Sequence, residues 1–236
     1  MWTEQVLQKL SDHSAYTRKD LFQLFLQEKP DLADSVFRWA LYNLQREQKL
    51  FRTDYDTYMT IKPKILPEYH PIYTDYAKGV SNKLSDRFPE INYVVFESVL
   101  LNEFLNHQIA QNTVYIQVEK DISSYISDTL QQEYGGIILN NPNRNEFDRY
   151  WVRNCIVVLD LISQAPLNSE SPHDICAEKL LVDMIADKSI AATFSPSELP
   201  FIFENVISSY RIDMRRLNRY AGRRGKAEDL KKYMRR

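Results

Sequence analysis

Two helical segments and the two strand-like runs that follow them, within residues 20–61, constrain the fold more than any other stretch of this chain. Residues 17–20 have the form of a capping box, in which the Thr17 side chain accepts a hydrogen bond from the Asp20 backbone and Asp20 reaches back. This pattern predicts a helix start. Because a helix rarely continues through the residue before a proline, Pro30 predicts its end.

The second helix is expected to begin at Asp34, as its N-cap, and to be amphipathic. Its apolar face would consist of Phe37, Ala40, Leu41 and Leu44. Its polar face carries Ser35, Arg38, Tyr42, Gln45 and Arg46. Arginine bonds guanine edges or phosphates, and hydroxyl and amide groups reach phosphates or bases. This face predicts a DNA recognition helix, with contacts from Ser35, Arg38, Tyr42 and Arg46.

Two strand-like runs, residues 50–52 and 57–61, follow on either side of Asp54-Tyr55-Asp56. Helix, turn, helix and two-stranded ribbon is the order of a winged helix-turn-helix. Basic side chains near the base of the expected wing are predicted to hold phosphate: Lys49, Arg52 and Lys62. Winged helices often carry glycine where Gln48 and Thr57 stand, because glycine adopts turn conformations freely.

Charge is distributed unevenly along a chain whose formal net charge is only −2. Residues 1–64 contain 10 Lys/Arg and 9 Asp/Glu, residues 65–210 contain 9 and 20, and residues 211–236 contain 11 and 3. The middle should repel phosphate, whereas the two ends should not. We therefore expect Arg223 and Arg224, in the basic tail, to contact DNA phosphates. Pairing of the tail with the acidic middle is the alternative.

Prolines between residues 62 and 71 mark a change in organisation. The predicted domains are a winged helix-turn-helix over 1–64, a linker with a bridging helix over 65–90, and an α/β domain over 91–236. The last domain alternates strands and helices before a helical C-terminal part, so the fold class is α/β (α+β). Expected elements are strands at 92–96, 113–118, 136–139 and 155–159, and helices at 121–132, from Ser171, from Ser195 and from Tyr210 to Gly222.

No motif for catalysis or metal binding stands out. His173 and Cys176 lie near Glu178, but no second ligand pair has zinc spacing, and no nucleophile elbow or phosphate loop occurs. Acids near predicted strand ends are Glu97, Glu103, Glu119 and Asp121. Neighbouring strand residues face opposite sides, so Glu119 and Lys120 do not form one site. We predict no enzyme, catalytic residue, metal or cofactor.

Glu178 and Asp183 are five residues apart on a predicted buried helix, which places them about 140° apart around its axis. They cannot form a tight carboxylate pair. We expect them to be buried structural charges whose partners are among Arg215, Arg216 and Arg219.

The composition of the chain indicates the cellular compartment in which we expect the protein. The two cysteines form no pairing framework, which favours reduced thiols in the cytosol. No apolar run approaches the ~20 residues of a membrane span, and the first residues lack the features of a signal peptide. We expect a cytoplasmic protein that does not bind a membrane.

The order of segments resembles the AbiEi-like family, antitoxins and transcriptional regulators of bacterial abortive-infection (phage-defence) systems. The resemblance covers nearly the whole chain, in a divergent branch whose wing lacks its expected glycines. It rests on the winged module followed by three short motifs: Leu101-Asn102-Glu103-Phe104, Glu178-Lys179-Leu180-Leu181-Val182-Asp183, and Arg216-Leu217-Asn218-Arg219-Tyr220-Ala221 before Arg223-Arg224.

The resemblance implies a repressor that binds double-stranded DNA at its own promoter and belongs to a toxin–antitoxin operon. Its functional partner would be a nucleotidyltransferase-like toxin, countered without a stable complex. Two alternatives remain open from the residues alone. One is a metal-dependent nucleic-acid enzyme using the acids of the α/β domain, and the other is a winged-helix module that binds a protein.

The expected wing yields a direct test. Lys62→Ala should weaken binding to all DNA sequences alike and reduce the slope of log affinity against log salt by about 1, because a phosphate contact carries no sequence information. Fluorescence anisotropy at several salt concentrations measures both. An unchanged slope would remove Lys62 from the interface.

Overall fold

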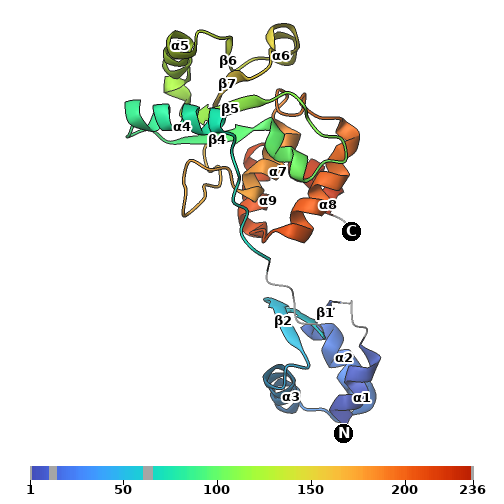
Figure 1. The fold of residues 1–236 in the computed structure, drawn as a ribbon. Coiled ribbons are helices and arrows are strands. Elements are labelled where there is room, and N and C mark those ends of the chain that lie inside the picture. The colour runs from blue at the N-terminus through green and yellow to red at the C-terminus, as the bar shows by residue number, and fades with distance from the viewer. Residues whose placement is uncertain (1, 11–14, 61–65, 235–236) are drawn as a thin grey trace. The chain divides into compact units, whose positions relative to one another are not determined.

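The structure, a computed structural model, describes residues 2–10, 15–60 and 66–234. The chain divides into two compact units, residues 1–65 and 66–236 (Figure 1). Each unit has hydrophobic clusters of its own. Helices and two sheets are combined, as expected for an α+β protein.

The described residues of the first unit form helices and a small antiparallel sheet. In chain order they are α1 (Trp2–Lys9), β1 (Tyr16–Thr17), α2 (Arg18–Glu28), α3 (Asp34–Arg46), β2 (Phe51–Asp54) and β3 (Thr57–Met59). Strand β3 lies between the other two, in the order β1-β3-β2. The ladder pairs Tyr16 with Tyr58 and Phe51 with Met59. Strand β1, just before α2, therefore forms one edge of the sheet beside β3, and β2 forms the other edge.

The capping box predicted at α2 is confirmed. The Asp20 backbone N–H donates to Thr17 Oγ1 over 3.1 Å, and the Thr17 N–H donates to Asp20 Oδ2 over 2.9 Å. Hydrogen bonds from Thr17 lower the pKa of Asp20, because they favour its charged form. The helix ends at Glu28, just before Lys29-Pro30, as predicted.

The start of α3 differs from the prediction. Ala33 is the N-cap residue and makes no side-chain cap bond, whereas Asp34, predicted as the cap, is the first helical residue. Its carboxylate is directed to two arginines instead, Arg18 and Arg38. Beyond the helix, Gln48 has a φ of +56°, so a glutamine occupies a left-handed position where glycine is common. Thr57 lies within β3.

The core of the first unit contains a pair of packed phenylalanines. Phe25 of α2 and Phe37 of α3 meet edge to face, with ring centroids 5.2 Å apart, and both side chains are buried. Aliphatic side chains complete the cluster: Val6, Leu10, Leu21, Leu32, Leu41, Leu44 and Leu50. One face of α3 is thus held against α2 and its opposite face is left uncovered.

The second unit begins with α4 (Asp75–Arg87) and is built on a mixed sheet. Its elements are β4 (Tyr93–Glu97), η1 (Ser98–Glu103), β5 (Thr113–Val118), η2 (Lys120–Ile122), α5 (Ser123–Tyr134), β6 (Ile138–Asn140), α6 (Arg144–Tyr150), β7 (Cys155–Asp160), α7 (Ala177–Ala186), η3 (Pro196–Glu198), α8 (Leu199–Ser209), α9 (Met214–Arg223) and α10 (Ala227–Met234). The strand order is β4-β5-β7-β6, antiparallel at β4–β5 and parallel elsewhere.

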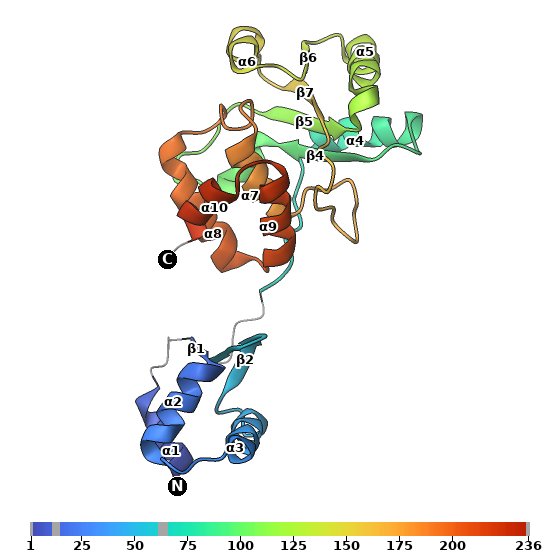
Figure 2. The ribbon, with the colours of Figure 1, turned by 180° about the vertical axis from the view of Figure 1, so that it is seen from behind.

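Helices cover both faces of this sheet (Figure 2). Alternate residues of β5 supply the two sides: Val114 and Ile116 pack in the cluster with α4 and α5, whereas Tyr115 packs with α7, α8, α9 and α10. The segment 65–90, expected as a linker with a bridging helix, contains α4, which packs in the second unit through Ala77, Val80 and Leu84.

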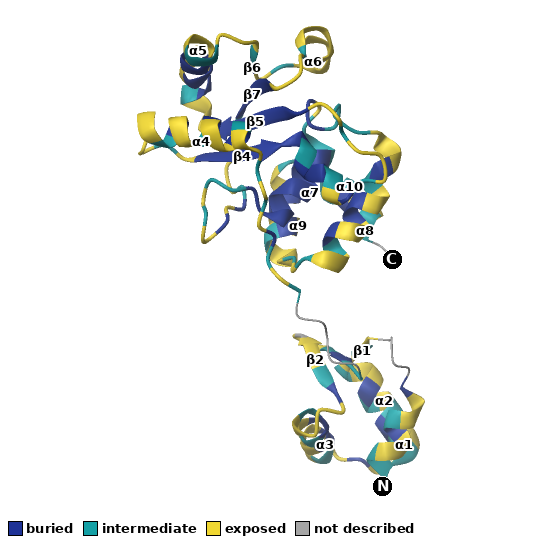
Figure 3. Cartoon of the chain, viewed as in Figure 1, coloured by how far each residue is buried: buried dark blue, intermediate teal, exposed yellow. Residues whose placement is uncertain are grey.

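Two C-terminal expectations are corrected. No helix starts at Ser171, because the chain there runs beside β4: the Val95 N–H donates to the His173 carbonyl over 2.8 Å, and α7 begins only at Ala177. In the basic tail, residues 227–234 form helix α10, whose Leu230 is buried. Helix α7 is buried almost all round, as predicted (Figure 3).

None of the helices within the described residues is both long and apolar enough to span a membrane.

The packing of Phe37 against Phe25 predicts a stability effect. Phe37→Ala should lower the free energy of unfolding of the first unit by about 3–5 kcal/mol, because it opens a cavity beside Phe25. Amide hydrogen exchange, read separately for residues of each unit, measures it. The control is Trp39→Ala on the same helix, since Trp39 is 63% exposed. An equal loss in the control would contradict the packing role of Phe37.

Candidate functional site

The uncovered face of α3 carries the predicted contact residues. Ser35, Arg38, Tyr42 and Arg46 are all exposed, and their spacing of three or four residues places them in one row along the helix. The Arg38 side chain is 64% exposed and Tyr42 is 63% exposed. Gln45 is turned back, because its Nε2 donates to the Leu41 carbonyl over 3.1 Å. The row therefore offers two guanidinium groups and two hydroxyls to a partner.

Arg18 joins this row in space, which the sequence did not indicate. Its Nη2 lies 3.4 Å from Asp34 Oδ1, and Arg38 Nε lies 3.0 Å from Asp34 Oδ2. Its guanidinium also lies over the Phe37 ring, 5.6 Å from the centroid. Sixteen residues separate Arg18 from Asp34, so no local pattern links them. The sequence feature that could have pointed to this cluster is the i,i+4 spacing of Asp34 and Arg38.

Trp39 was also missed. It is 63% exposed although it is a large aromatic residue, and it stands next to Arg38 on α3. A cavity of about 190 Å³ lies between α1 and α3, lined by Trp2, Trp39, Asn43 and Lys49 among others. Trp39 therefore presents a large apolar surface to solvent at the rim of this cavity.

The predicted phosphate contacts beside the hairpin differ in their surroundings. Arg52 is exposed on β2, donates to the Tyr55 carbonyl at the hairpin tip, and has its guanidinium 5.7 Å from the centroid of the Tyr55 ring. Lys49 pairs with Glu47 over 3.0 Å, and the hydrogen bond that Lys49 donates to the Glu47 carboxylate raises the pKa of Lys49. Lys62 lies outside the described residues.

Arg223 and Arg224, the predicted contacts of the tail, have partners in the second unit. Arg223 Nε donates to Ser163 Oγ over 2.8 Å and is otherwise exposed. The Arg224 side chain is only 13% exposed, with its guanidinium 3.9 Å from both Asp183 and Asp187. The geometry of Arg224 corrects its expected role, because a largely buried guanidinium between two carboxylates is not available to phosphate. This is the pairing that was left open as the alternative.

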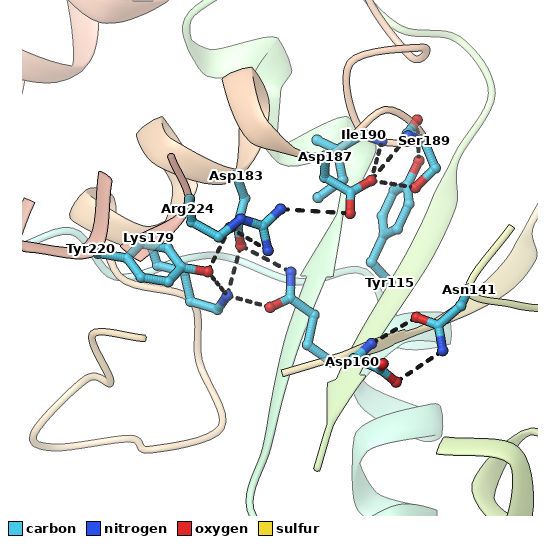
Figure 4. Close-up of polar contacts among 11 residues, drawn as sticks. Tyr115, Asn141, Asp160, Lys179, Asp183, Asp187, Ser189, Ile190, Tyr220 and Arg224 are labelled. Carbon is cyan, nitrogen blue, oxygen red and sulfur yellow. Dashed lines mark hydrogen bonds and ion pairs between the residues drawn. The ribbon is translucent and has the colours of Figure 1, made fainter. Parts of the chain in front are cut away.

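A buried polar network occupies the second unit, with Lys179 and Asp183 of α7 at its centre (Figure 4). Lys179 is 0% exposed and Asp183 is 1% exposed, and their charged groups lie 2.6 Å apart. Lys179 Nζ also donates to Gln117 of β5 and to the Tyr220 hydroxyl of α9. The Tyr220 hydroxyl donates to Asp183 over 2.7 Å, and Gln117 Nε2 donates to it over 2.9 Å. The network therefore joins a strand and two helices.

Asp183 is ionised within this network. Burial alone raises the pKa of its carboxyl, but the charges of Lys179 and Arg224 and the hydrogen bonds from Lys179 and Gln117 outweigh burial and lower it. The Tyr220 pKa is raised, first by burial and then by the Asp183 charge, so its hydroxyl keeps its proton and donates. A second cluster extends the network, since Asp187 accepts bonds from Ser189 and Tyr115 donates to the Ser189 carbonyl.

The partners predicted for the buried acids need correction. Asp183 is paired with Lys179 and Arg224, not with Arg215, Arg216 or Arg219. Glu178 instead accepts a hydrogen bond from the Asp213 backbone N–H, over 2.8 Å. It contributes to a polar cavity of about 340 Å³ at the start of α7 and α9. Other charged groups lining that cavity bond one another, as Arg211 does with Glu68.

The acids considered for nuclease chemistry lie in different surroundings. Glu97 is 0% exposed and accepts hydrogen bonds from Thr74 and Asn112, which satisfy its carboxylate in the interior. Glu119 is exposed and accepts from Asn92. Glu103 accepts from the Tyr210 hydroxyl. Glu97 and Glu119 stand at the two ends of the β4–β5 pair, so they do not converge.

His173 and Cys176 are likewise explained by packing. The His173 ring stacks on Tyr93 with centroids 3.8 Å apart, and Nδ1 lies 3.1 Å from the Tyr93 carbonyl oxygen. Burial raises the pKa of the Cys176 thiol to about 12, and this thiol donates to the Pro166 carbonyl. In the part of the chain that the structure describes, no three His, Cys, Asp or Glu residues are grouped to hold a metal ion.

The buried pair generates a pH prediction. The pKa of Asp183 is lower in the folded state than its unfolded value of about 3.9, so its stabilising contribution is full above that value and is lost as pH falls through the folded pKa. Asp183→Asn should lower the free energy of unfolding at pH 7 by about 3–5 kcal/mol, because Lys179 is left buried without a counter-charge.

Urea unfolding at pH 7 and at pH 3 tests this. The variant should lose less stability on acidification than the wild type, and Lys179→Met/Asp183→Leu should recover much of the loss. Equal acid sensitivity of wild type and Asp183→Asn would contradict an ionised Asp183. Asp148→Asn, on the exposed face of α6, is the control.

Comparison with known proteins gives a family but no described activity. A search of curated proteins finds no match. Among solved structures, the crystal structure of RV2827C protein from Mycobacterium tuberculosis aligns over 98% of this chain and 76% of its own, at 13% identity and a TM-score of 0.36. Residues 36–236 match a family described as "Family of unknown function (DUF6577)". This protein therefore belongs to the DUF6577 family.

Proposed function

We propose that this protein is a DNA-binding transcriptional regulator whose first unit is a winged helix-turn-helix. The observation that carries the proposal is the row of exposed Ser35, Arg38, Tyr42 and Arg46 on a helix whose opposite face is buried. The order of α2, α3 and the β2–β3 hairpin supports it, as does the pairing of β1 with β3. In such modules the second helix enters the major groove.

The roles follow from where each side chain lies on α3. Ser35 and Arg38, near the helix start, would meet base edges or phosphates first, and Tyr42 and Arg46 would follow along the groove. Arg18, at the first position of α2, adds a cation where the first helix crosses the DNA backbone. Arg52 and Lys62 would hold phosphate from the wing.

The proposal extends to the operon. On the resemblance to AbiEi-like proteins, the DNA bound would be the protein's own promoter, and the partner would be a nucleotidyltransferase-like toxin countered without a stable complex. Such a role in phage defence is exercised in the cytoplasm. Two of the motifs that carry this resemblance supply Lys179, Asp183 and Tyr220 to the buried network, which supports a shared architecture of the second unit.

Fluorescence anisotropy on the protein's own upstream DNA, against scrambled DNA of equal length and composition, tests the proposal. We expect selective binding that weakens steeply between 50 mM and 200 mM salt, because phosphate contacts release counterions. Equal, weak binding to both DNAs, or none, would contradict a sequence-reading regulator.

Arg38→Ala should weaken binding to the upstream DNA by about 1–3 kcal/mol and reduce the preference over scrambled DNA, since a bidentate arginine discriminates bases. The matched control is Arg144→Ala, which removes the same charge from an exposed site on α6 of the second unit. If the two variants bind alike, α3 is not the reading helix.

A protein partner is the second candidate, favoured by the exposed Trp39. Tryptophan, tyrosine and arginine are the residues most enriched at the energetic centres of protein interfaces, and α3 presents all three. In that case Trp39→Ala would abolish binding to a protein partner and salt would have little effect. Under the DNA-binding proposal, the salt dependence is steep.

A further inference from the structure

We infer that Asp34 competes with DNA phosphates for Arg18 and Arg38 and so restrains the affinity of the α3 face for DNA. The inference rests on the proposed function, because it concerns the regulation of that same surface. In the free protein, the Asp34 carboxylate at the start of α3 binds these arginines in place of a DNA phosphate.

One carboxylate bridges two helices at this point. Asp34 Oδ1 lies 3.4 Å from Arg18 Nη2, and Asp34 Oδ2 lies 3.0 Å from Arg38 Nε. A phosphate group presents the same chemistry to arginine, since both are anionic groups with several oxygen acceptors. The two guanidiniums therefore already have, in the free protein, the kind of partner that the DNA backbone would offer.

The surroundings make the competition effective. A shallow cavity of about 310 Å³ is lined by Arg18, Lys19, Asp34 and Asp56, with Phe22 and Phe37 between them. Arg18 and Lys19 would attract a phosphate to it, and Asp34 and Asp56 oppose it. Asp34 is also the first residue of α3, where the positive end of the helix dipole favours an anion. It occupies the position that a phosphate would take.

Because the first unit is almost neutral, the single carboxylate of Asp34 can change its affinity for DNA. Residues 1–64 contain 10 Lys/Arg against 9 Asp/Glu, so the attraction of this unit for DNA depends on local placement rather than on net charge. Asp34 is 61% exposed, Arg18 is 43% exposed and Arg38 is 64% exposed, so the pairs are weak enough to exchange with an incoming phosphate.

The test compares two variants that change net charge equally. Asp34→Asn removes the carboxylate that holds both arginines, whereas Asp31→Asn removes an exposed carboxylate three residues away that pairs with no arginine or lysine of the described part of the chain. Anisotropy is measured on the upstream and the scrambled DNA at several salt concentrations.

We expect Asp34→Asn to raise affinity for both DNAs about three- to tenfold at 0.1 M salt and to steepen the salt slope by about 1 to 2, because two guanidiniums become free for phosphate. Asp31→Asn should raise it less than twofold, since a charge beyond the first contact is screened. Equal gains in the two variants, or no gain in either, would overturn the inference.

A second comparison tests whether Asp34 acts through Arg18. If Asp34 acts by occupying Arg18, the gain from Asp34→Asn should shrink when Arg18→Gln is already present, and an undiminished gain in that background would remove Arg18 from the competition. Asp34→Ser, a second uncharged polar substitution, repeats the measurement if Asp34→Asn lowers the helical content seen by circular dichroism.

The outcomes separate this inference from the proposed function. Wild-type protein that binds its upstream DNA while Asp34→Asn behaves like Asp31→Asn leaves the regulator intact and removes the competition. If neither wild type nor Asp34→Asn binds either DNA at 50 mM salt, the DNA-binding role fails and the inference fails with it.

Discussion

The second unit depends on a lysine and an aspartate that are both out of contact with water. Removing two charges from water is costly, and only a complete set of partners offsets the cost. Lys179 and Asp183 have that set because β5 supplies Gln117, α9 supplies Tyr220 and the end of α9 supplies Arg224. The positions of α7 and α9 against the sheet are therefore specified by polar geometry as well as by apolar packing.

A second carboxylate forms the same i,i+4 pair with a different result. Asp34 and Arg38 on α3 have the helical spacing of Lys179 and Asp183, yet Asp34 and Arg38 are more than half exposed. In water such a pair contributes little to stability and can exchange its partner, whereas in the interior it fixes a structure. The Asp34–Arg38 pair of the first unit accordingly remains available at a surface, whereas the Lys179–Asp183 pair of the second unit holds its helices together.

Local signals were strong enough to predict much of the fold. The capping box at Thr17 and Asp20 and the β-branched run of β5 lie where the sequence predicted, because each depends on neighbours in the chain. Ser171 failed as a helix start, since the chain after it forms a single turn, closed by the Asp174 N–H on the Ser171 carbonyl, and then pairs with β4. Arg18 was missed because its partner, Asp34, is remote in sequence.

The residues of α3 that face away from the core were predictable from the sequence, since the period of a helix separates its two faces whatever it packs against. The sequence also predicted that Asp183 would be buried in an apolar helix. The cation that pairs with Asp183 could not be predicted in this way, and neither could the enclosure of Arg224 in contrast to the exposure of Arg38. Those outcomes depend on which elements come together, and the free energy of a charge depends on the groups and water around it.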